Sequence, residues 1–399
     1  MVYITIKDIL LARKAGPAPE NAGSALRKGR IDELDIDMIV LAAGLSKRMG
    51  VFKPLLPVGD MPAVARCVKM AAEAGVRDVV IVTGHNAGTL EDVVGKDTHP
   101  GIRLVHNAAY QEGMFSSVRE GVSALRDGSD AFFLLPADCC ASTADTLSAL
   151  MRVFGENGGV SVVRPAFCGK RGHPPLVPGR FAEPLLSYDG EGGLKGFLRP
   201  LPTTEVEMGD PGALLDMDTP EDYAALLEHL GVPCFPDRER CAKLLLKYDT
   251  PKDIVGHCES VAALALEFAR EMAERGARLD AGLLESACLL HDIKRAEPNH
   301  ARAGMELLLR EGYPKAAILV GSHMELRGGV SDVIGEKELL FLADKMCRGE
   351  KIVALEERER EISGKYPHDS EAYASAMSRM ATARKIRDML KSGAVSFRF

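Results

Sequence analysis

Residues 41–53 combine a glycine-containing turn with basic side chains, a combination suited to binding a nucleoside triphosphate. The segment Leu41-Ala-Ala-Gly-Leu-Ser-Lys-Arg-Met-Gly50 follows directly on a short apolar run, and Lys53 lies just beyond it. Backbone N–H groups in such a turn can hydrogen-bond phosphate oxygens, while Arg48 and Lys53 can neutralise their charge. An ordinary strand-to-helix turn with exposed basic residues shows the same pattern, so this loop alone indicates only phosphate binding.

Aspartates far apart in the sequence could add a divalent cation to this loop. The apolar run Ala131–Leu135 leads to Asp138, and Leu214-Leu-Asp-Met-Asp218 supplies two more carboxylates. Mg²⁺ takes carboxylate oxygens together with substrate phosphates. A single aspartate at a strand end is more often a helix cap, so the interpretation requires that two of these carboxylates converge on the loop.

A second set of histidines and aspartates lies in the C-terminal half. His257, the adjacent pair His291-Asp292, and Asp344 fall in different segments of helical spacing. Imidazole and carboxylate ligands from separate helices can build a metal site in a helical core. The His-Asp pair follows the apolar run Ala287–Leu290, and a buried ionised aspartate needs a partner, which a metal would supply. Any one of these residues alone could be a core histidine or a capping aspartate; the spaced set favours a metal.

The elements that must position the first set alternate between strands and helices. Short apolar runs separated by segments of helical spacing predict a doubly wound, Rossmann-like α/β domain, mostly parallel, with helices on both faces. Ligands of such sheets lie beyond the carboxyl ends of the strands, where the turns after Leu41, Val82 and Leu135 are expected. The expected strands are 38–42, 79–82, 102–105 and 131–135, and the expected helices 62–74, 116–125 and 144–154.

The second set lies in a region where the strand signal largely disappears. Thr250-Pro-Lys-Asp253 predicts a helix start, with a capping hydroxyl, proline at the first position and an acidic first turn. Further helices are expected around 283–293, 301–311, 315–323, 336–347 and 371–390. The chain should therefore contain an N-terminal extension of unknown role (1–36), an α/β domain (37–230), a linker (231–244) and an all-α domain with a helical tail (245–399).

Composition limits the class of protein. The 399 residues carry a net charge of −7, which argues against non-specific binding to nucleic acid or to an anionic membrane. Nine cysteines without a CxxC pair indicate reduced thiols. We see no signal-peptide pattern and no apolar run long enough to cross a bilayer. These features predict a cytoplasmic protein that binds neither nucleic acid nor membrane.

Residues 38–230 resemble the molybdenum cofactor cytidylyltransferase family, within a larger group that includes the guanylyl and sugar-nucleotide enzymes. The matching stretches occur in the family's order and cover nearly the whole domain. They are Leu41–Gly50, Val82-Thr-Gly-His85, Asn107 with Glu112-Gly-Met-Phe-Ser-Ser117, Asp138, Arg171-Gly-His-Pro174 and Asp216-Met-Asp-Thr-Pro-Glu-Asp222.

This resemblance implies a reaction and assigns roles. A terminal phosphate of molybdopterin would attack the α-phosphorus of CTP in line, and pyrophosphate would leave. Catalytic roles fall to Arg48 and Lys53, which would hold the triphosphate, and to Asp138 and Asp218, which would bind Mg²⁺. Contacts to the nucleotide or the pterin would come from Ala42, Ala43, Gly44, Gly84, Asn107, Ser116, Arg171 and His173.

Three details bear on the choice of substrates. The guanylyl branch carries Ala-Gly-Gly where this chain has Ala42-Ala-Gly44, which favours CTP over GTP. The chain has Ala137-Asp-Cys-Cys140 where the family often has Gly-Asp-x-Pro, and Lys53-Pro-Leu-Leu-Pro57 resembles the sugar-nucleotide enzymes. The acceptor is therefore less defined than the reaction type.

Residues 245–350 resemble the HD phosphohydrolase superfamily through His257, His291-Asp292 and Asp344, while His300 and His323 fall where some members have ligands for a second metal. This resemblance implies a divalent cation such as Mn²⁺, Fe or Mg²⁺ that activates water for attack on a phosphate ester. Three basic residues could contact that phosphate or simply be surface charges: Lys294, Arg295 and Lys345.

Three functions remain open at this point. The first is a bifunctional cytidylyltransferase and phosphohydrolase, and the second is a guanylyl- or sugar-phosphate nucleotidyltransferase with an HD domain. The third is a non-catalytic protein that hands the cofactor to an apo-molybdoenzyme, with the HD half as a nucleotide sensor.

Overall fold

The computed structural model describes residues 34–94, 101–326, 329–330, 333–367 and 370–392, and the chain divides into two compact units at Val232/Pro233. Most of the expected extension, 1–33, lies outside the described residues, and strand β1 begins at Ile36. The expected linker, 231–244, contains the start of a helix, α9 (Arg238–Lys247). Asp237 caps this helix, because its carboxylate accepts a hydrogen bond from the backbone N–H of Arg240.

Unit 1 (residues up to Val232) is built on one mixed, eight-stranded sheet. The strand order is β10-β7-β9-β6-β1-β4-β5, and β8 pairs with β7. Strands β6, β1, β4 and β5 run parallel, as expected for a doubly wound fold. In contrast, β9 runs antiparallel to both β6 and β7, which the sequence pattern did not predict. The strands are β1 (Ile36–Leu41), β4 (Val79–Thr83), β5 (Ile102–His106), β6 (Ala131–Pro136), β7 (Val162–Phe167), β8 (Lys170–Arg171), β9 (Leu176–Pro178) and β10 (Thr203–Glu207).

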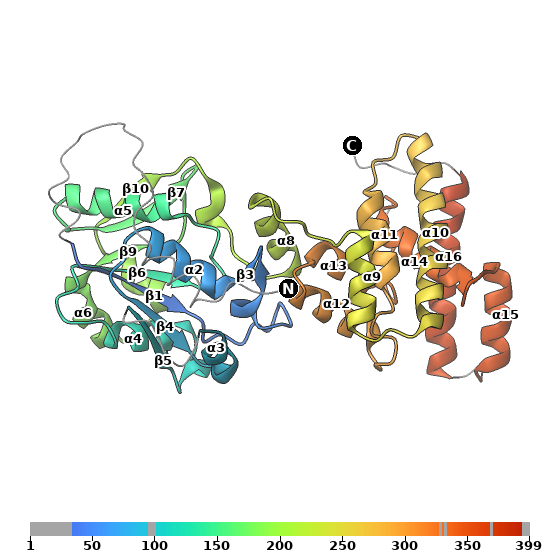
Figure 1. Ribbon diagram of the computed structural model, residues 1–399, viewed down its shortest axis with the longest axis horizontal. Helices are drawn as coiled ribbons and strands as arrows, with labels where there is room; N and C mark the ends of the chain where they lie inside the picture. Colours follow the sequence, from blue (N-terminus) through green and yellow to red (C-terminus); the bar gives the residue numbers. More distant parts are fainter. Residues whose placement is uncertain (1–33, 95–100, 327–328, 331–332, 368–369, 393–399) are drawn as a thin grey trace. The chain divides into compact units, whose positions relative to one another are not determined.

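Helices cover both faces of this sheet (Figure 1). Helices α4, α6 and α7 bury one face in a core that includes Ile39, Phe132 and Val118. Helix α4 approaches β1 closely, because a Cβ at Gly121 would lie 2.3 Å from Cγ2 of Ile39. The helices are α2 (Ala63–Glu73), α3 (Ala87–Val94), α4 (Met114–Ser123), α5 (Ala144–Glu156), α6 (Ala182–Ser187), α7 (Gly193–Leu198) and α8 (Pro220–His229).

Unit 2 (residues from Pro233) is helical in its described part, apart from the short hairpin β11 (Cys347–Arg348) and β12 (Lys351–Ile352). Helix α10 packs against α11 and α14, and α11 also contacts α13, so these four helices enclose a common core. Besides α9, the helices are α10 (Lys252–Glu274), α11 (Ala281–Leu290), α12 (His300–Arg310), α13 (Pro314–Ser322), α14 (Glu336–Met346), α15 (Leu355–Lys365) and α16 (Glu371–Ser392). Among the described helices, none is both long and apolar enough to cross a membrane.

Candidate functional site

The glycine-containing loop of unit 1 forms one wall of a cavity of about 590 Å³ at the carboxyl ends of β1 and β6. Its backbone is tied to the sheet, because the N–H of Ala42 donates to the carbonyl of Val82 at 2.9 Å. Residues 41–48 and Lys53 line the cavity, together with Asp138, His173 and Asp218. Eight of the expected site residues thus share one cavity: Ala42, Ala43, Gly44, Arg48, Lys53, Asp138, His173 and Asp218.

Charged groups from three distant segments meet in this cavity. The ammonium group of Lys53 lies 2.6 Å from Oδ2 of Asp138 and 2.7 Å from Oδ1 of Asp218. The guanidinium of Arg48 binds the other oxygen of Asp218 at 2.8 Å. Hydrogen bonds from Lys53 and Arg48 hold the pKa of Asp218 below its usual range, although partial burial opposes them. The ionised form of Asp218 is therefore favoured. The carboxylates of Asp138 and Asp218 can act together as cation ligands.

Asp216 adds a third carboxylate to the cavity lining, and the candidate site did not include it. Burial, reinforced by the negative charges of Asp218 and Asp138, raises the pKa of Asp216. The raised pKa of Asp216 thus reflects burial first and the neighbouring carboxylates second. A divalent cation on Asp138 and Asp218 would offset the charge of these carboxylates, so the donor set fits Mg²⁺.

His173 presents a neutral imidazole to the cavity. Burial, together with the positive charge of Arg164, lowers the pKa of His173. Its backbone is fixed by two hydrogen bonds, one donated by its N–H to Ala213 and one donated to its carbonyl by the hydroxyl of Ser142, both 2.8 Å long. Its Nδ1 is buried without a hydrogen-bond partner among the described residues, so a polar group of a bound molecule could satisfy it.

The other four expected contact residues lie outside the cavity lining. Arg171 is on β8, half exposed, and binds Glu205 at 2.6 Å. Asn107 is fully buried, and its amide donates to the hydroxyls of Ser116 and Ser117 at 2.8 and 2.9 Å. Asn107 and Ser116 therefore order the turn that leads into α4 rather than line the cavity themselves.

Gly84 acts through packing against the loop. A Cβ at this position would come within 2.8 Å of the Cβ of Ala43 and 2.7 Å of the Cβ of Tyr110. Both neighbours line the cavity, so the missing side chain lets β4 and the loop approach each other. The cavity is also lined by Tyr110, Met114 and Cys139, which were not among the expected site residues. They could have been found, because each lies within or beside a stretch that carries the family resemblance.

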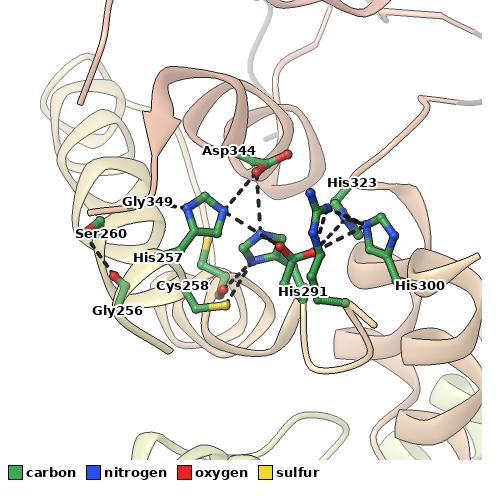
Figure 2. A network of polar contacts seen from close by, with 12 residues as sticks. Gly256, His257, Cys258, Ser260, His291, His300, His323, Asp344 and Gly349 are labelled. Atoms are coloured by element: carbon green, nitrogen blue, oxygen red, sulfur yellow. Dashed lines mark hydrogen bonds and ion pairs between the residues drawn. The ribbon is translucent and has the colours of Figure 1, made fainter. Parts of the chain in front are cut away.

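The expected metal ligands of unit 2 converge from five helical elements (Figure 2). His257, His300 and Asp344 lie on α10, α12 and α14, and His291-Asp292 and His323 follow α11 and α13. Their ligand atoms form two clusters, within each of which these atoms lie no more than 4.8 Å apart. His257, His291 and Asp292 make up the first cation group, and Asp292, His300 and His323 make up the second cation group. Asp344 borders the first group, because its Oδ1 lies 3.3 Å from Nε2 of His257 and 3.6 Å from Nε2 of His291. All six expected ligands therefore lie at one centre.

Backbone carbonyls orient three of these imidazoles. Nδ1 of His257 donates to the carbonyl of Gly349 at 3.1 Å, that of His291 to Cys288 at 2.8 Å, and that of His323 to Val320 at 2.7 Å. A carbonyl can only accept, so Nδ1 carries the proton in each ring. Nε2 then faces the centre, where its lone pair can bind a metal once it carries no proton. Burial would lower the pKa of His291, but Cys258 and Asp344 raise it well above its usual range, so a cation would take the place of the proton on its Nε2.

The charges of this centre also fit cations. Burial lowers the pKa of His300 and of His323, which keeps both rings neutral at physiological pH. Burial would raise the pKa of Asp344, but Lys345 and the neighbouring histidines hold it well below its usual range. Among the residues that the structure describes, Nε2 of His291 and Oδ1 of Asp292 are buried without a hydrogen-bond partner, and a cation would satisfy both atoms. The donor set therefore fits one divalent cation in each group.

The three basic residues near this centre differ in availability. Lys345 is buried, binding the carboxylate of Asp344 and the carbonyl of His323, so it supports the ligands and is not free for a phosphate. Lys294 pairs with Glu297 at 3.0 Å. Arg295 remains half exposed, and its NH1 lies 3.2 Å from Nε2 of His300 and 3.6 Å from Oδ1 of Asp292.

Comparisons with known proteins match a different family model to each unit. Residues 38–206 match the family model of the MobA-like NTP transferase domain, and residues 254–349 match that of the HD domain. The molybdenum cofactor cytidylyltransferase of Escherichia coli (strain K12) is 28% identical over 193 residues, which is 48% of this chain and 96% of the relative.

Two further matches cover about half of the chain or less. The bifunctional protein GlmU of Brevibacillus brevis is 32% identical over 133 residues, which is 33% of this chain and only 28% of GlmU. Among solved structures, Rv0371c from Mycobacterium tuberculosis H37Rv is 25% identical and covers 49% of this chain and 98% of its own, with a TM-score of 0.42.

Proposed function

We propose that this chain, which contains a MobA-like NTP transferase domain and an HD domain, is a bifunctional enzyme. Unit 1 would transfer CMP from CTP to molybdopterin and release pyrophosphate, and unit 2 would hydrolyse a phosphate ester. The observation that carries the first activity is the meeting of Arg48 and Lys53 with Asp138 and Asp218 in one cavity. The cytidylyltransferase relative supports CTP and a molybdopterin acceptor.

The geometry supports a mechanism based on positioning and charge neutralisation. An oxygen of the acceptor's terminal phosphate would attack the α-phosphorus while the bond to the β-phosphate oxygen breaks. Backbone N–H groups of residues 42–44 would hold phosphate oxygens, and Arg48 and Lys53 would bind the charge that develops on the leaving pyrophosphate. Asp138 and Asp218 would hold Mg²⁺, which supplies further neutralisation of the phosphates. Nδ1 of His173 would form a hydrogen bond with the substrate that accepts CMP.

The test measures pyrophosphate release with each NTP paired with molybdopterin or with sugar phosphates. We expect turnover with CTP and molybdopterin, and loss of at least a hundredfold in the Asp138→Ala variant. Asp145→Ala, in the first turn of α5, is the matched control, because it removes one carboxylate from a helix of the same unit. Unchanged pyrophosphate release in Asp138→Ala would instead favour a non-catalytic protein that delivers the cofactor to an apo-molybdoenzyme.

A second candidate for unit 1 is a sugar-phosphate nucleotidyltransferase. The similarity to GlmU favours it, and so does Lys53-Pro-Leu-Leu-Pro57 at the cavity wall. Turnover with sugar phosphates and none with molybdopterin would establish this alternative, and a preference for GTP would overturn the assignment of the donor.

For unit 2, the supporting observation is the convergence of six potential metal ligands. Two of their buried ligand atoms lack a hydrogen-bond partner among the described residues. A divalent cation bound there would activate a water molecule for attack on phosphorus. The residues of the chain would orient the ligands through their carbonyl hydrogen bonds and keep Asp344 ionised through Lys345. Metal analysis of the purified protein tests this: we expect the Asp292→Ala variant to lose metal, and equal metal content would exclude the centre.

A further inference from the structure

We infer that Arg295 competes with a divalent cation for the second cation group of unit 2, and that an inorganic phosphate group relieves this competition. The inference rests on the metal centre proposed above. It assigns to Arg295 control over how many cations the centre holds, a role that neither the sequence pattern nor the similarity to HD domains specifies.

The guanidinium of Arg295 already contacts ligand atoms of the second cation group. It follows Asp292 by three residues in the turn after α11, where its N–H donates to the Asp292 carbonyl at 2.8 Å. Its NH1 then reaches Nε2 of His300 at 3.2 Å and Oδ1 of Asp292 at 3.6 Å. Two of the three ligand atoms of this group therefore face a positive charge supplied by the chain itself.

The contact geometry shows that this position attracts positive charge. Nδ1 of His323 faces the Val320 carbonyl, so Nε2 is the nitrogen that faces the second cation group. Arg295 can only donate, so Nε2 of His300 accepts from it. Nε2 of His323 lies 3.2 Å from Nε2 of His300, and both nitrogens lie within 3.6 Å of Oδ1 of Asp292. Three potential ligand atoms therefore converge on one position, which favours a cation there.

The first cation group is not blocked in this way. Its neighbouring basic residue, Lys345, binds Oδ2 of Asp344 and leaves Oδ1 facing His257 and His291. A cation can therefore bind the first group without displacing Lys345. The two groups should differ in affinity although both are built from histidine and aspartate.

Arg295 can leave its position because 51% of its side chain is exposed. A guanidinium pairs well with phosphate oxygens through two parallel hydrogen bonds. It cannot hold a phosphate in this way and remain against His300 and Asp292. Phosphate and the second cation should therefore bind cooperatively, each favouring the state in which Arg295 has moved.

The experiment titrates chelator-treated, full-length protein with Mn²⁺ by calorimetry, with and without inorganic phosphate. In the wild type we expect phosphate to tighten the weaker of the two Mn²⁺ sites of unit 2. Arg295→Met should tighten that site roughly tenfold without phosphate, as expected for loss of one charge-assisted contact, and should abolish the phosphate effect. The tighter site should change less than about twofold.

Controls separate this idea from the metal centre itself. Arg302→Met removes an exposed arginine of α12 that pairs with Glu306, and should behave as wild type. His323→Ala should remove the weaker site in either background. Mn²⁺ bound by unit 1 is common to all variants and cancels in the comparison. Folding is checked by circular dichroism, with Arg295→Gln as a second variant.

Two results would overturn the inference, and they differ from each other. If Arg295→Met and Arg295→Gln leave the affinity of the weaker Mn²⁺ site unchanged or lower it, Arg295 does not compete with the cation. This result does not affect the proposal of a metal centre in unit 2. If His291→Ala leaves Mn²⁺ binding by the whole chain unchanged, the metal centre fails and the role of Arg295 fails with it.

Discussion

Replacing Lys53 by methionine tests the charge arrangement of the unit 1 cavity. The substitution keeps most of the apolar stem and removes the ammonium group between Asp138 and Asp218. It should lower the stability of unit 1 at neutral pH and also lower pyrophosphate release, because the same group is proposed to bind the phosphates. Stability is the sharper readout, since it does not depend on knowing the substrate.

The magnitude follows from the contacts. Hydrogen bonds between charged groups contribute about 1.5–3 kcal/mol each, and breaking a buried ion pair costs about 3–5 kcal/mol. The side chains of Lys53, Asp138 and Asp218 are 13%, 20% and 30% exposed, so water compensates part of the loss. Arg48 also continues to hold Asp218. We therefore expect a loss of about 2–3 kcal/mol.

The pH dependence has a defined sign. Burial lowers the pKa of Lys53, but Asp138 and Asp218 outweigh burial and raise it, so the ammonium group stabilises the fold until the pH exceeds the ordinary lysine range. The pKa of Asp218 is lowered by Lys53, so its contribution is complete above about pH 4 and is lost as the pH falls through its folded value. The deficit of the variant should be constant between about pH 5 and 9 and shrink below pH 4.

Hydrogen exchange of peptides from β1 and β6, measured on the full chain, reports this loss for unit 1 alone. A deficit of 2–3 kcal/mol corresponds to roughly 30- to 150-fold faster exchange. Lys47→Met, an exposed lysine of the same loop, should change exchange little. The reasoning fails if exchange in Lys53→Met matches wild type, or if Asp138→Asn costs the same with and without Lys53.

Three further outcomes are expected. Asp292→Asn should bring down metal content, measured by plasma mass spectrometry, more than any other single ligand change, because Asp292 belongs to both cation groups; equal losses from a His300 variant would contradict the shared role. Gly121→Ala should lower the free energy of unfolding of unit 1 by about 1–3 kcal/mol in urea denaturation, since its Cβ would clash with Ile39, and a neutral result would mean that α4 can shift. Thr219→Ala breaks the capping box of α8 and should cost about 1 kcal/mol in the same assay, whereas Thr219→Ser should cost little.

Much of the fold followed from periodicity because each element is locally consistent with it. Strand β1 is buried at all six positions. Its last four residues form an apolar run that ends in a glycine-containing turn, which is typical of a buried parallel strand. The antiparallel insertion of β9 between β6 and β7 could not be predicted in this way, because strand order depends on pairing between distant segments. Strands β8 and β10 both pair with β7, and this places Arg171 beside Glu205 and outside the cavity lining.

Residue types identified the two sites, but the contacts within them required the structure. Asp138 and Asp218 were candidates because a carboxylate after a strand is chemically informative wherever it lies. That Lys53 bridges them, or that Arg295 reaches His300, depends on side-chain geometry that no spacing rule encodes. Asp216 was not among the expected site residues, because a motif with two aspartates does not reveal which of them binds the cation.

Both sites pair their carboxylates with a basic side chain of the chain itself: Lys53 in unit 1 and Arg295 in unit 2. Uncompensated carboxylates brought together would repel and would raise one another's pKa, as Asp216 already shows. A phosphate substrate and a divalent cation arrive with opposite charges, so a basic side chain that moves from carboxylate to phosphate leaves each group paired before and after binding. Such an exchange avoids burying an isolated charge at any stage. The exchange also predicts that, in each unit, the basic residue helps to determine how strongly bound phosphate changes the affinity for the metal, and how strongly bound metal changes the affinity for phosphate.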